Sequence, residues 1–446
     1  MRKYCILFLS LFFLVACDDF LSVKPKAEIV EHVYFDTPEG FEDALYGAYS
    51  TLSASALYGE YLSWGLLDVF AQYYKKNSIN DNVKSMLILE HEKLRSYYNL
   101  IWNKGYETIG YVNNVLRNLE RKSENSMHYY KLYKGEALGL RAYLHFDLLR
   151  LFAPHVGSKP NAQGIPYVTI YEVAVSPFKT VSEVYDLVIK DLKEAELLLQ
   201  EDETLLVYPR KFVLNDGFAT CREIHFNLYA AQALLARVYW MNGDLENALI
   251  YAKKVIDSGK FPLEDKLNIR SFMAGTITEK EAVWGVYTTQ ILDNVKKNFY
   301  TYDMTYTWLP ADDNTALYSV AQEDGNDWFR ILIGEEESDR IVRCMKIVNE
   351  TKISNPGAYT SKSIEGINMI RIPEMYLIAA EALLESDPDE AQKYFDTFIV
   401  SRGLFKYKDR PGSPQVTLED IVKERRKEFV QEGQYFYTLK RGNMDI

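Results

Sequence analysis

The chain has 446 residues, of which 26% are charged and 48% are hydrophobic, a balance typical of globular proteins. Its formal net charge of −12 argues against nucleic acid as a partner, because Lys and Arg must neutralise the phosphates. A body built from helical repeats can carry this length as a single unit.

The N-terminus carries the pattern of a secretory signal peptide. Arg2 and Lys3 precede an apolar run over residues 4–15, which is shorter than the ~20 residues of a membrane-spanning helix. The run ends in Leu-Val-Ala-Cys, which resembles the lipobox of bacterial lipoproteins. We therefore expect residues 1–16 to be removed and Cys17 to be lipidated, so that acyl chains hold the protein at a membrane. The alternative is that Cys17 is an ordinary cysteine of the signal peptide.

Two cysteines, Cys221 and Cys344, lie in the body of the chain. In an oxidising compartment they could form one disulfide, and two buried free thiols are the alternative. Neither has a cysteine or histidine nearby at the spacing of metal ligands.

The first part of the mature chain is predicted to be extended and then helical. Residues 17–38 form an extended leader, because Pro25 and Pro38 both disfavour helix at the residue before them. Pro38 at a first helical position, followed by Glu39, predicts a helix that begins at Thr37. Poor periodicity predicts a loop over 75–84, and a long helix follows over about 91–120. Its buried side carries Leu94, Tyr97, Tyr98, Ile101, Trp102, Tyr106, Ile109, Val112, Val115, Leu116 and Leu119.

Residues 131–152 are apolar nearly all round and predict a central helix. His145 lies within it. A lone histidine on such a helix is expected to be a hydrogen-bonded core residue, and a ligand or catalyst is the alternative. Proline at 154 ends this helix, and the next helix is predicted from Ser182 to about Gln200.

Two segments repeat one pattern. Residues 228–241 and 245–256 read as two helices joined by a tight turn at Gly243, with alanines that permit close approach of the helices. Residues 372–385 and 389–400 repeat it. Both look like tetratricopeptide hairpins. We therefore predict one mainly α-helical body over 39–446, with hairpins at about 95–152, 182–258 and 370–402.

Between the two clear hairpins the helical period weakens. Residues 260–368 are predicted to be a loop-rich subregion, and residues 281–287 a short strand that places Trp284 in the core. Long loops on a rigid scaffold often carry function. After the second hairpin, residues 418–437 read as one helix, in which Glu424, Arg425 and Arg426 could form ion pairs.

A search for catalytic motifs finds none. The chain has no Gly-rich phosphate loop, no His-Glu-x-x-His, no Gly-x-Ser-x-Gly and no Cys-x-x-Cys, and its six histidines are isolated from one another. The acidic segments 312–314 and 323–327 could hold a hard cation, but they lack the spacing of a calcium loop and are expected to be solvated. We predict no cofactor, no metal and no enzymatic activity. Paired carboxylates for glycoside hydrolysis remain an alternative, since any two of 63 acids could meet.

The aromatic residues point to a ligand. Sugars offer flat C–H faces that lie on aromatic rings, while their hydroxyls bond to neighbouring polar side chains. Two sets of residues fit this chemistry, and the alternative is that the rings fill a satellite core beneath the loops. The candidate platform comprises Tyr300, Tyr302, Tyr306, Trp308, Trp328, Asn298, Asp312 and Asn326, with Tyr73 and Tyr74 as a second group.

Six segments in chain order resemble the SusD/RagB family of Bacteroidetes lipoproteins. They begin at Cys17 (Cys-Asp-Asp-Phe-Leu-x-Val-Lys-Pro-Lys), Glu39 (Glu-Gly-Phe-x-x-Ala-Leu-x-Gly-Ala-Tyr), Gly105 (Gly-Tyr-x-x-Ile-x-x-Val-Asn), Glu136 (Glu-Ala-x-x-x-Arg-Ala-Tyr-x-x-Phe-Asp-Leu-x-Arg-Leu-Phe), Ile370 (Ile-Arg-x-Pro-Glu-Met-Tyr-Leu-x-x-Ala-Glu-Ala) and Glu424 (Glu-Arg-Arg-x-Glu-Phe-x-x-Glu-Gly).

The resemblance implies an outer-membrane lipoprotein at the cell surface that is built on tetratricopeptide hairpins. It implies that the protein captures oligosaccharide, or in some members peptide, for a SusC-type TonB-dependent transporter without catalysing a reaction. A lid that binds only its transporter, or a surface glycoside hydrolase, would be the alternatives. The ligand residues proposed above do not come from the resemblance.

Overall fold

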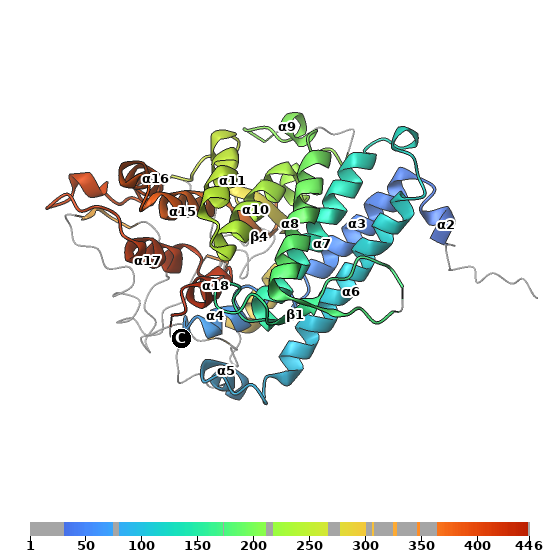
Figure 1. Ribbon diagram of the computed structural model, residues 1–446, viewed down its shortest axis with the longest axis horizontal. Helices are drawn as coiled ribbons and strands as arrows, with labels where there is room; N and C mark the ends of the chain where they lie inside the picture. The colour runs from blue at the N-terminus through green and yellow to red at the C-terminus, as the bar shows by residue number, and fades with distance from the viewer. Residues whose placement is uncertain are drawn as a thin grey trace, which may run out of the picture.

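The computed structural model describes residues 31–74, 80–172, 174–210, 217–265, 277–299, 306, 324–327, 346–347 and 364–444. Helices dominate these residues, and two antiparallel pairs of short strands accompany them (Figure 1). Lipidation at Cys17 and the leader up to residue 30 lie outside the described residues. Within them, no helix is both long enough and apolar enough to cross a membrane.

The described residues form both helices and short strands. In order they are α2 (Glu31–Tyr34), α3 (Pro38–Leu52), α4 (Leu66–Phe70), α5 (Asp81–Leu87), α6 (Arg95–Leu119), α7 (Tyr130–Phe152), β1 (Gln163–Pro166), β2 (Phe178–Thr180), α8 (Val181–Leu198), α9 (Asp202–Leu205), α10 (Leu228–Asn242), α11 (Leu245–Asp257), β3 (Ala282–Tyr287), α12 (Ile291–Phe299), β4 (Gly366–Arg371), α15 (Ile372–Leu383), α16 (Pro388–Ser401), α17 (Leu418–Glu428) and α18 (Gln434–Arg441).

Sequential helices pack in pairs, as the hairpin pattern predicts. α6 packs on α7, α7 on α8, α10 on α11, and α15 on α16, so that the pairs form a row across the molecule (Figure 1). Gly243 closes α10 with a φ of 82°, and Asp244 then caps α11 by accepting a hydrogen bond from the Asn247 amide at 3.1 Å. The mainly α fold with helical hairpins is therefore confirmed.

The centre of this row is α7, which is buried along almost its whole length, as its sequence predicts. Strands β3 and β4 pair antiparallel beside it, with Trp284 opposite Ile370, and the Trp284 side chain is fully buried. The predicted strand is therefore present. In contrast, α12 lies within the segment predicted to be loop-rich, and the sequence analysis did not identify it.

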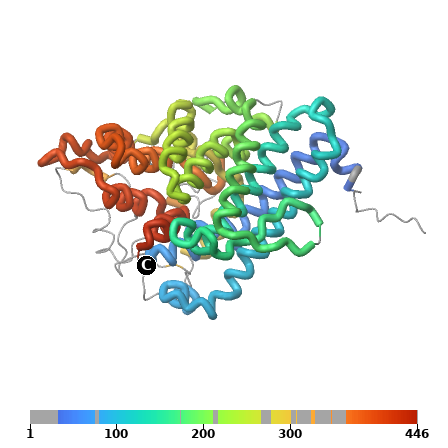
Figure 2. The backbone as a smooth tube through the Cα atoms, in the orientation of Figure 1, coloured from blue at the N-terminus to red at the C-terminus, as the bar shows by residue number. Residues whose placement is uncertain are grey.

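The C-terminal segment is not the single helix predicted over 418–437. It breaks into α17 and α18, because Gln431 and Gly433 adopt φ values of 63° and 68°. The Asp68 carboxylate accepts hydrogen bonds from both of these backbone amides, at 2.6 and 3.2 Å. A Cβ at Gly433 would lie 2.4 Å from the Leu62 carbonyl oxygen, so the bend needs glycine. Figure 2 shows the resulting contact between the red C-terminal end of the chain and the blue segment that contains α4.

The ion pairs suggested for the α17 residues are found in part. Glu424 pairs with Lys427 at 2.6 Å, whereas the Arg425 guanidinium lies 4.1 Å from the centre of the Trp240 ring. Burial lowers the pKa of Arg425 to about 10. Cys221 is a free thiol whose pKa is raised by burial to about 11, and Cys344 lies outside the described residues.

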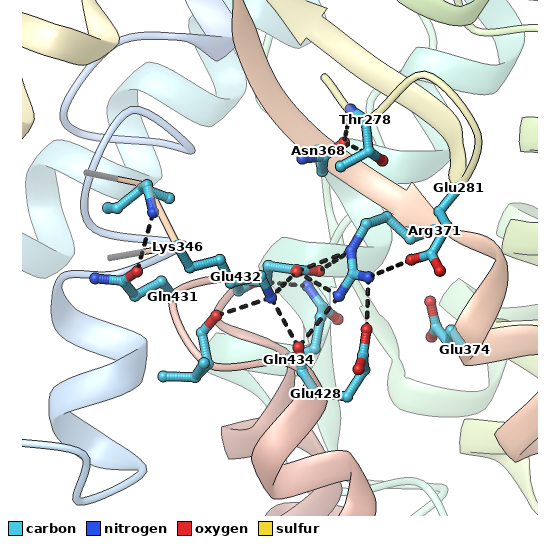
Figure 3. A network of polar contacts seen from close by, with 12 residues as sticks. Thr278, Glu281, Lys346, Asn368, Arg371, Glu374, Glu428, Gln431, Glu432 and Gln434 are labelled. Carbon is cyan, nitrogen blue, oxygen red and sulfur yellow. Dashed lines mark hydrogen bonds and ion pairs between the residues drawn. The ribbon is translucent and has the colours of Figure 1, made fainter. Parts of the chain in front are cut away.

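A cluster of buried charges joins the strands to the C-terminal helices. The Arg371 guanidinium contacts the carboxylates of Glu281 at 3.0 Å, Glu428 at 2.6 Å and Glu432 at 2.6 Å (Figure 3). Arg402 pairs with Glu281 and Glu428, each at 2.9 Å. The Arg371 side chain has no exposed surface, so protein groups, these carboxylates among them, replace the water around its charge.

Replacing Arg371 by alanine should lower the free energy of unfolding by about 3–5 kcal/mol, because the buried Glu281 and Glu428 and the partly buried Glu432 would lose a shared counter-ion. Urea denaturation followed by circular dichroism measures this loss. The matched control is Arg95→Ala, which removes a largely exposed arginine paired with Glu92 and should change the stability little. Equal losses in the two variants would contradict the role assigned to the cluster.

Candidate functional site

The predicted aromatic platform is only partly covered by the structure. Tyr73, Tyr74 and Tyr306 have exposed fractions of 0%, 1% and 2%. The Tyr74 and Tyr306 rings stack with their centres 5.1 Å apart, and the Tyr306 hydroxyl donates to the Glu60 carboxylate at 2.9 Å. In this structure these rings therefore offer no open face. They are part of the main hydrophobic core and do not form a separate satellite core.

Two polar members of the predicted platform, Asn298 and Asn326, lie within the described residues. Asn298 is buried, and Asn326 is exposed. The acidic side chains beside Asn326 form ion pairs within the protein. Asp327 pairs with Lys427 at 2.8 Å, and Asp324 pairs with Arg410 at 3.4 Å. The remaining members lie outside the described residues, and their ligand role stays a prediction; they are Tyr300, Tyr302, Trp308, Asp312 and Trp328.

A groove along α6 has the chemistry expected of a ligand site. We call it the α6 groove. It has a volume of about 560 Å³, within the usual range for small-molecule sites. Its walls are α6 and the chain between β1 and β2, which runs beside α6 in Figure 1. The lining residues are Trp102, Tyr106, Gly110, Pro166, Val168, Ile170, Tyr171, Glu172, Ala174 and Ser176.

Helix α6 places two aromatic side chains and a glycine along the face that lines the groove. Trp102, Tyr106 and Gly110 are four residues apart, so they follow one another along one side of α6. Phe152 packs edge-on against Trp102 at 5.1 Å and holds its half-buried ring in position. A Cβ at Gly110 would meet no atom within 4 Å, so the absence of a side chain there leaves the groove open.

The opposite wall is held by hydrogen bonds from the helices. The Tyr106 hydroxyl donates to the Pro166 carbonyl at 2.8 Å, and the Asn113 amide donates to the Val168 carbonyl at 2.9 Å. Arg117 donates to the Tyr171 carbonyl at 3.4 Å and lies 4.6 Å from the centre of the Tyr171 ring. These side chains thus hold the wall in place without a bound ligand.

His145 completes the attachment of this wall. Its Nε2 accepts a hydrogen bond from the Val168 amide at 2.9 Å, so Nδ1 carries the proton and donates to the Arg141 carbonyl at 2.8 Å. Burial of the ring lowers its pKa to about 3, and it stacks on Tyr167 at 4.0 Å. His145 is therefore a neutral, hydrogen-bonded core residue, and the prediction for it is confirmed.

A second cavity of about 370 Å³ adjoins the groove and shares Ile170, Tyr171 and Glu172 with it. We call it the polar pocket. Its cationic side chains are paired: Arg117 with Glu31, Lys134 with Glu194 at 2.7 Å, and Arg141 with Asp191 at 2.7 Å. Two exposed carboxylates of the lining, Glu120 and Glu172, form no ion pair with any residue that the structure describes.

Apolar periodicity predicts Trp102 and Tyr106 on the buried side of their helix, and the structure shows both half-buried. Apolar periodicity identified the correct face but could not show that the neighbouring wall leaves a groove there. The glycine one turn after two aromatic residues was the available signal. Among the described residues, no group of three His, Cys, Asp or Glu side chains is placed to hold a metal ion.

Comparison with protein families gives two adjoining matches. A family model described as "Starch-binding associating with outer membrane" matches residues 19–240, and one described as "SusD family" matches residues 229–445. A SusD-like protein of Formosa agariphila, P38, is 27% identical over 99% of this chain and 91% of its own length.

Solved structures share the fold. A SusD superfamily protein from Bacteroides thetaiotaomicron superposes with a TM-score of 0.70 at 24% identity, over 92% of this chain and 89% of its own. A laminarin-binding SusD-like protein superposes with a TM-score of 0.59 at 16% identity, over 91% of this chain and 92% of its own. At these identities the likeness concerns the fold.

The buried His145 should make stability fall in mild acid. Its pKa is about 3 in the folded protein and about 6.5 when unfolded, so between these values only the unfolded chain takes up the proton. Its contribution is therefore lost as pH falls below about 6.5, at up to about 1.4 kcal/mol per pH unit. His145→Gln should flatten the decline in unfolding free energy measured between pH 7 and 5. The control His91→Gln changes an exposed histidine and should keep the wild-type slope; a wild-type slope in His145→Gln would contradict the assignment.

Proposed function

This chain belongs to the SusD/RagB family, and from that premise we propose that it is a non-catalytic lipoprotein of the cell surface that captures oligosaccharide. In this proposal Cys17 carries the lipid anchor, and the bound glycan passes to a SusC-type TonB-dependent transporter. The description of the matching family model, starch binding at the outer membrane, supports the ligand class and the location.

The observation that carries the proposal is the α6 groove. Trp102, Tyr106 and Tyr171 supply aromatic surface for the C–H faces of sugar rings, and the adjoining polar pocket supplies hydrogen-bonding groups for hydroxyls. The wall is already held by Asn113, His145 and Arg117, so little ordering would be needed when a ligand binds. An open groove of this kind suits part of a longer glycan chain.

Binding without cleavage is part of the proposal, supported by the match to the SusD family. Glycoside hydrolysis usually requires two carboxyl groups on either side of the scissile bond. The described lining of the α6 groove contains one, Glu172, and the adjoining polar pocket adds Glu120 and Glu194, so cleavage is tested directly in the experiment below. A peptide could also lie on aromatic rings, and for that reason peptides belong in the binding test below.

Filling the α6 groove tests the proposal. Gly110→Leu places a side chain in open space on α6, so the helix should be at least as stable, because leucine forms helix better than glycine. If the groove binds glycan, binding should fall at least tenfold. The soluble body from Asp18 onward is titrated with malto- and laminari-oligosaccharides and screened on a glycan and peptide array, with analysis for cleavage products.

The control is Ser96→Leu, which adds the same side chain at an exposed position of α6 about 21 Å away along the helix and should bind as the wild type does. Unchanged binding in Gly110→Leu would show that the groove is not the site. Cleavage of a bound glycan would overturn the non-catalytic assignment. No binding of any sugar or peptide would favour the lid whose only partner is its transporter.

The charges around the groove predict a preference for neutral glycans. Every cationic residue of the polar pocket is paired, whereas Glu120 and Glu172 are not paired with described residues. A laminari-oligosaccharide should therefore bind several-fold more tightly at low salt than the same chain oxidised to carry uronic acids. Glu172→Gln should reduce this difference, and salt should reduce it in the wild type.

Glu419→Gln is the control for that comparison, because it removes an exposed carboxylate from the start of α17, outside both cavities, and should leave the preference unchanged. Equal or tighter binding of the oxidised chain to the wild type would contradict the predicted preference.

A further inference from the structure

We propose that the protein has a second carbohydrate site, for a neutral sugar unit, in a pocket between α3 and the chain that follows β3. We call it the α3 pocket. It has a volume of about 450 Å³ and shares no lining residue with the α6 groove. The inference has only the ligand class in common with the proposed function. The lining residues are Tyr46, Tyr49, Ser50, Ser53, Ile224, Tyr287, Thr288, Thr289 and Gln290.

Two tyrosine rings of this pocket are open to solvent. Tyr46 is 38% exposed and Tyr287 is 52% exposed, in contrast to the buried tyrosines of the predicted platform. The Tyr46 ring is held edge-on by His225 at 5.6 Å and by Phe218 at 6.4 Å. Tyr287 is the last residue of β3, opposite Gly366 of β4. Both rings are thus attached to regular elements, which limits the entropy lost on binding.

The polar groups of the pocket can bond to hydroxyls. The side chains of Ser50, Thr289 and Gln290 are exposed, and in the part of the chain that the structure describes they form no hydrogen bond. Deeper in the pocket, the Tyr49 hydroxyl is occupied, because it donates to the Glu136 carboxylate at 2.6 Å and accepts from the Phe226 amide at 2.7 Å. The available donors and acceptors therefore lie at the mouth, beside the two exposed rings.

None of the lining residues carries a charge. An ionic ligand would lose hydration there without gaining a counter-ion, which disfavours phosphates, uronic acids and amines. A neutral sugar has C–H faces for the tyrosine rings and hydroxyls for Ser50, Thr289 and Gln290. The α3 pocket therefore disfavours anions and cations alike by its lack of charge. At the α6 groove and the polar pocket, Glu120 and Glu172, which form no ion pair with described residues, disfavour anions.

Stoichiometry tests the inference. Maltotriose and laminaritriose are used as probes, and equilibrium dialysis at saturation counts the molecules bound per protein. The wild type should bind two, and Tyr287→Ala and Gly110→Leu should each bind one. The combination of the two changes should bind none. Tyr287 is exposed at a strand end, so its removal should leave the thermal melt nearly unchanged.

Phe405→Ala is the control, because it removes another aromatic ring of similar exposure, 51%, from outside the pocket, and it should still bind two. The second variant Gln290→Ala should also lose one site. One molecule per wild-type protein, unaffected by Tyr287→Ala and Gln290→Ala, would overturn the inference and leave the α6 groove as the site. One molecule that disappears in Tyr287→Ala but persists in Gly110→Leu would support the α3 pocket and overturn the α6 groove. No binding of either probe would overturn both.

Discussion

Buried pairs of guanidinium and carboxylate groups join the helices of this protein, and its C-terminal half depends on the cluster around Arg371. Lys346, Arg371 and Arg402 meet Glu281, Glu428 and Glu432, so three positive charges face three negative ones. Although burial alone would raise the pKa of Glu428, the guanidinium groups of Arg402 and Arg371 lower it to about 2. An unpaired buried charge in this cluster would cost several kcal/mol. Strands β3 and β4 and the helices α17 and α18 are therefore expected to fold as one cooperative unit.

The same kind of joint recurs through the hairpins. Arg222 joins Glu136 of α7 to Asp202 of α9, and Arg237 of α10 pairs with Glu374 of α15 at 2.6 Å. These residues explain in part why the family could be identified from the sequence. Glu136, Arg371, Glu374 and Glu428 all belong to the segments that resemble SusD/RagB proteins, so part of the resemblance lies in buried charges that hold helices together. Such residues indicate which fold the chain adopts, but they line neither proposed ligand site and so cannot indicate the ligand.

The local features of the fold could be predicted from the sequence, and the long-range ones could not. Periodicity, Pro38 and Gly243 indicated the helix limits because these signals act over a few residues. The break between α17 and α18 depends on Asp68, which is 363 residues from Gln431 in the chain. Likewise, Tyr306 lies in a sequence segment with the composition of a ligand platform. Its ring is nevertheless buried, because it contacts Tyr74 and Glu60 from distant segments. An aromatic residue among polar neighbours looks the same in sequence whether its ring is exposed or covered.

In the α6 groove, the backbone attachments that hold the wall and the side chains of the proposed ligand surface belong to the same few residues. The chain over 166–171 is attached to the helices through its backbone, by Tyr106, Asn113, His145 and Arg117. Ile170, Tyr171 and Glu172 have exposed side chains, and of these the Tyr171 ring is in contact with Arg117. If the groove is the proposed glycan site, substitutions at Ile170 and Glu172 should change the ligand without loosening the wall. On the helix side, Gly110 has no side chain, and a Cβ added there would meet no atom within 4 Å. Access of a ligand to the groove therefore also depends on this one position. The proposed ligand surface is thereby separate from the buried charges that hold the helices together.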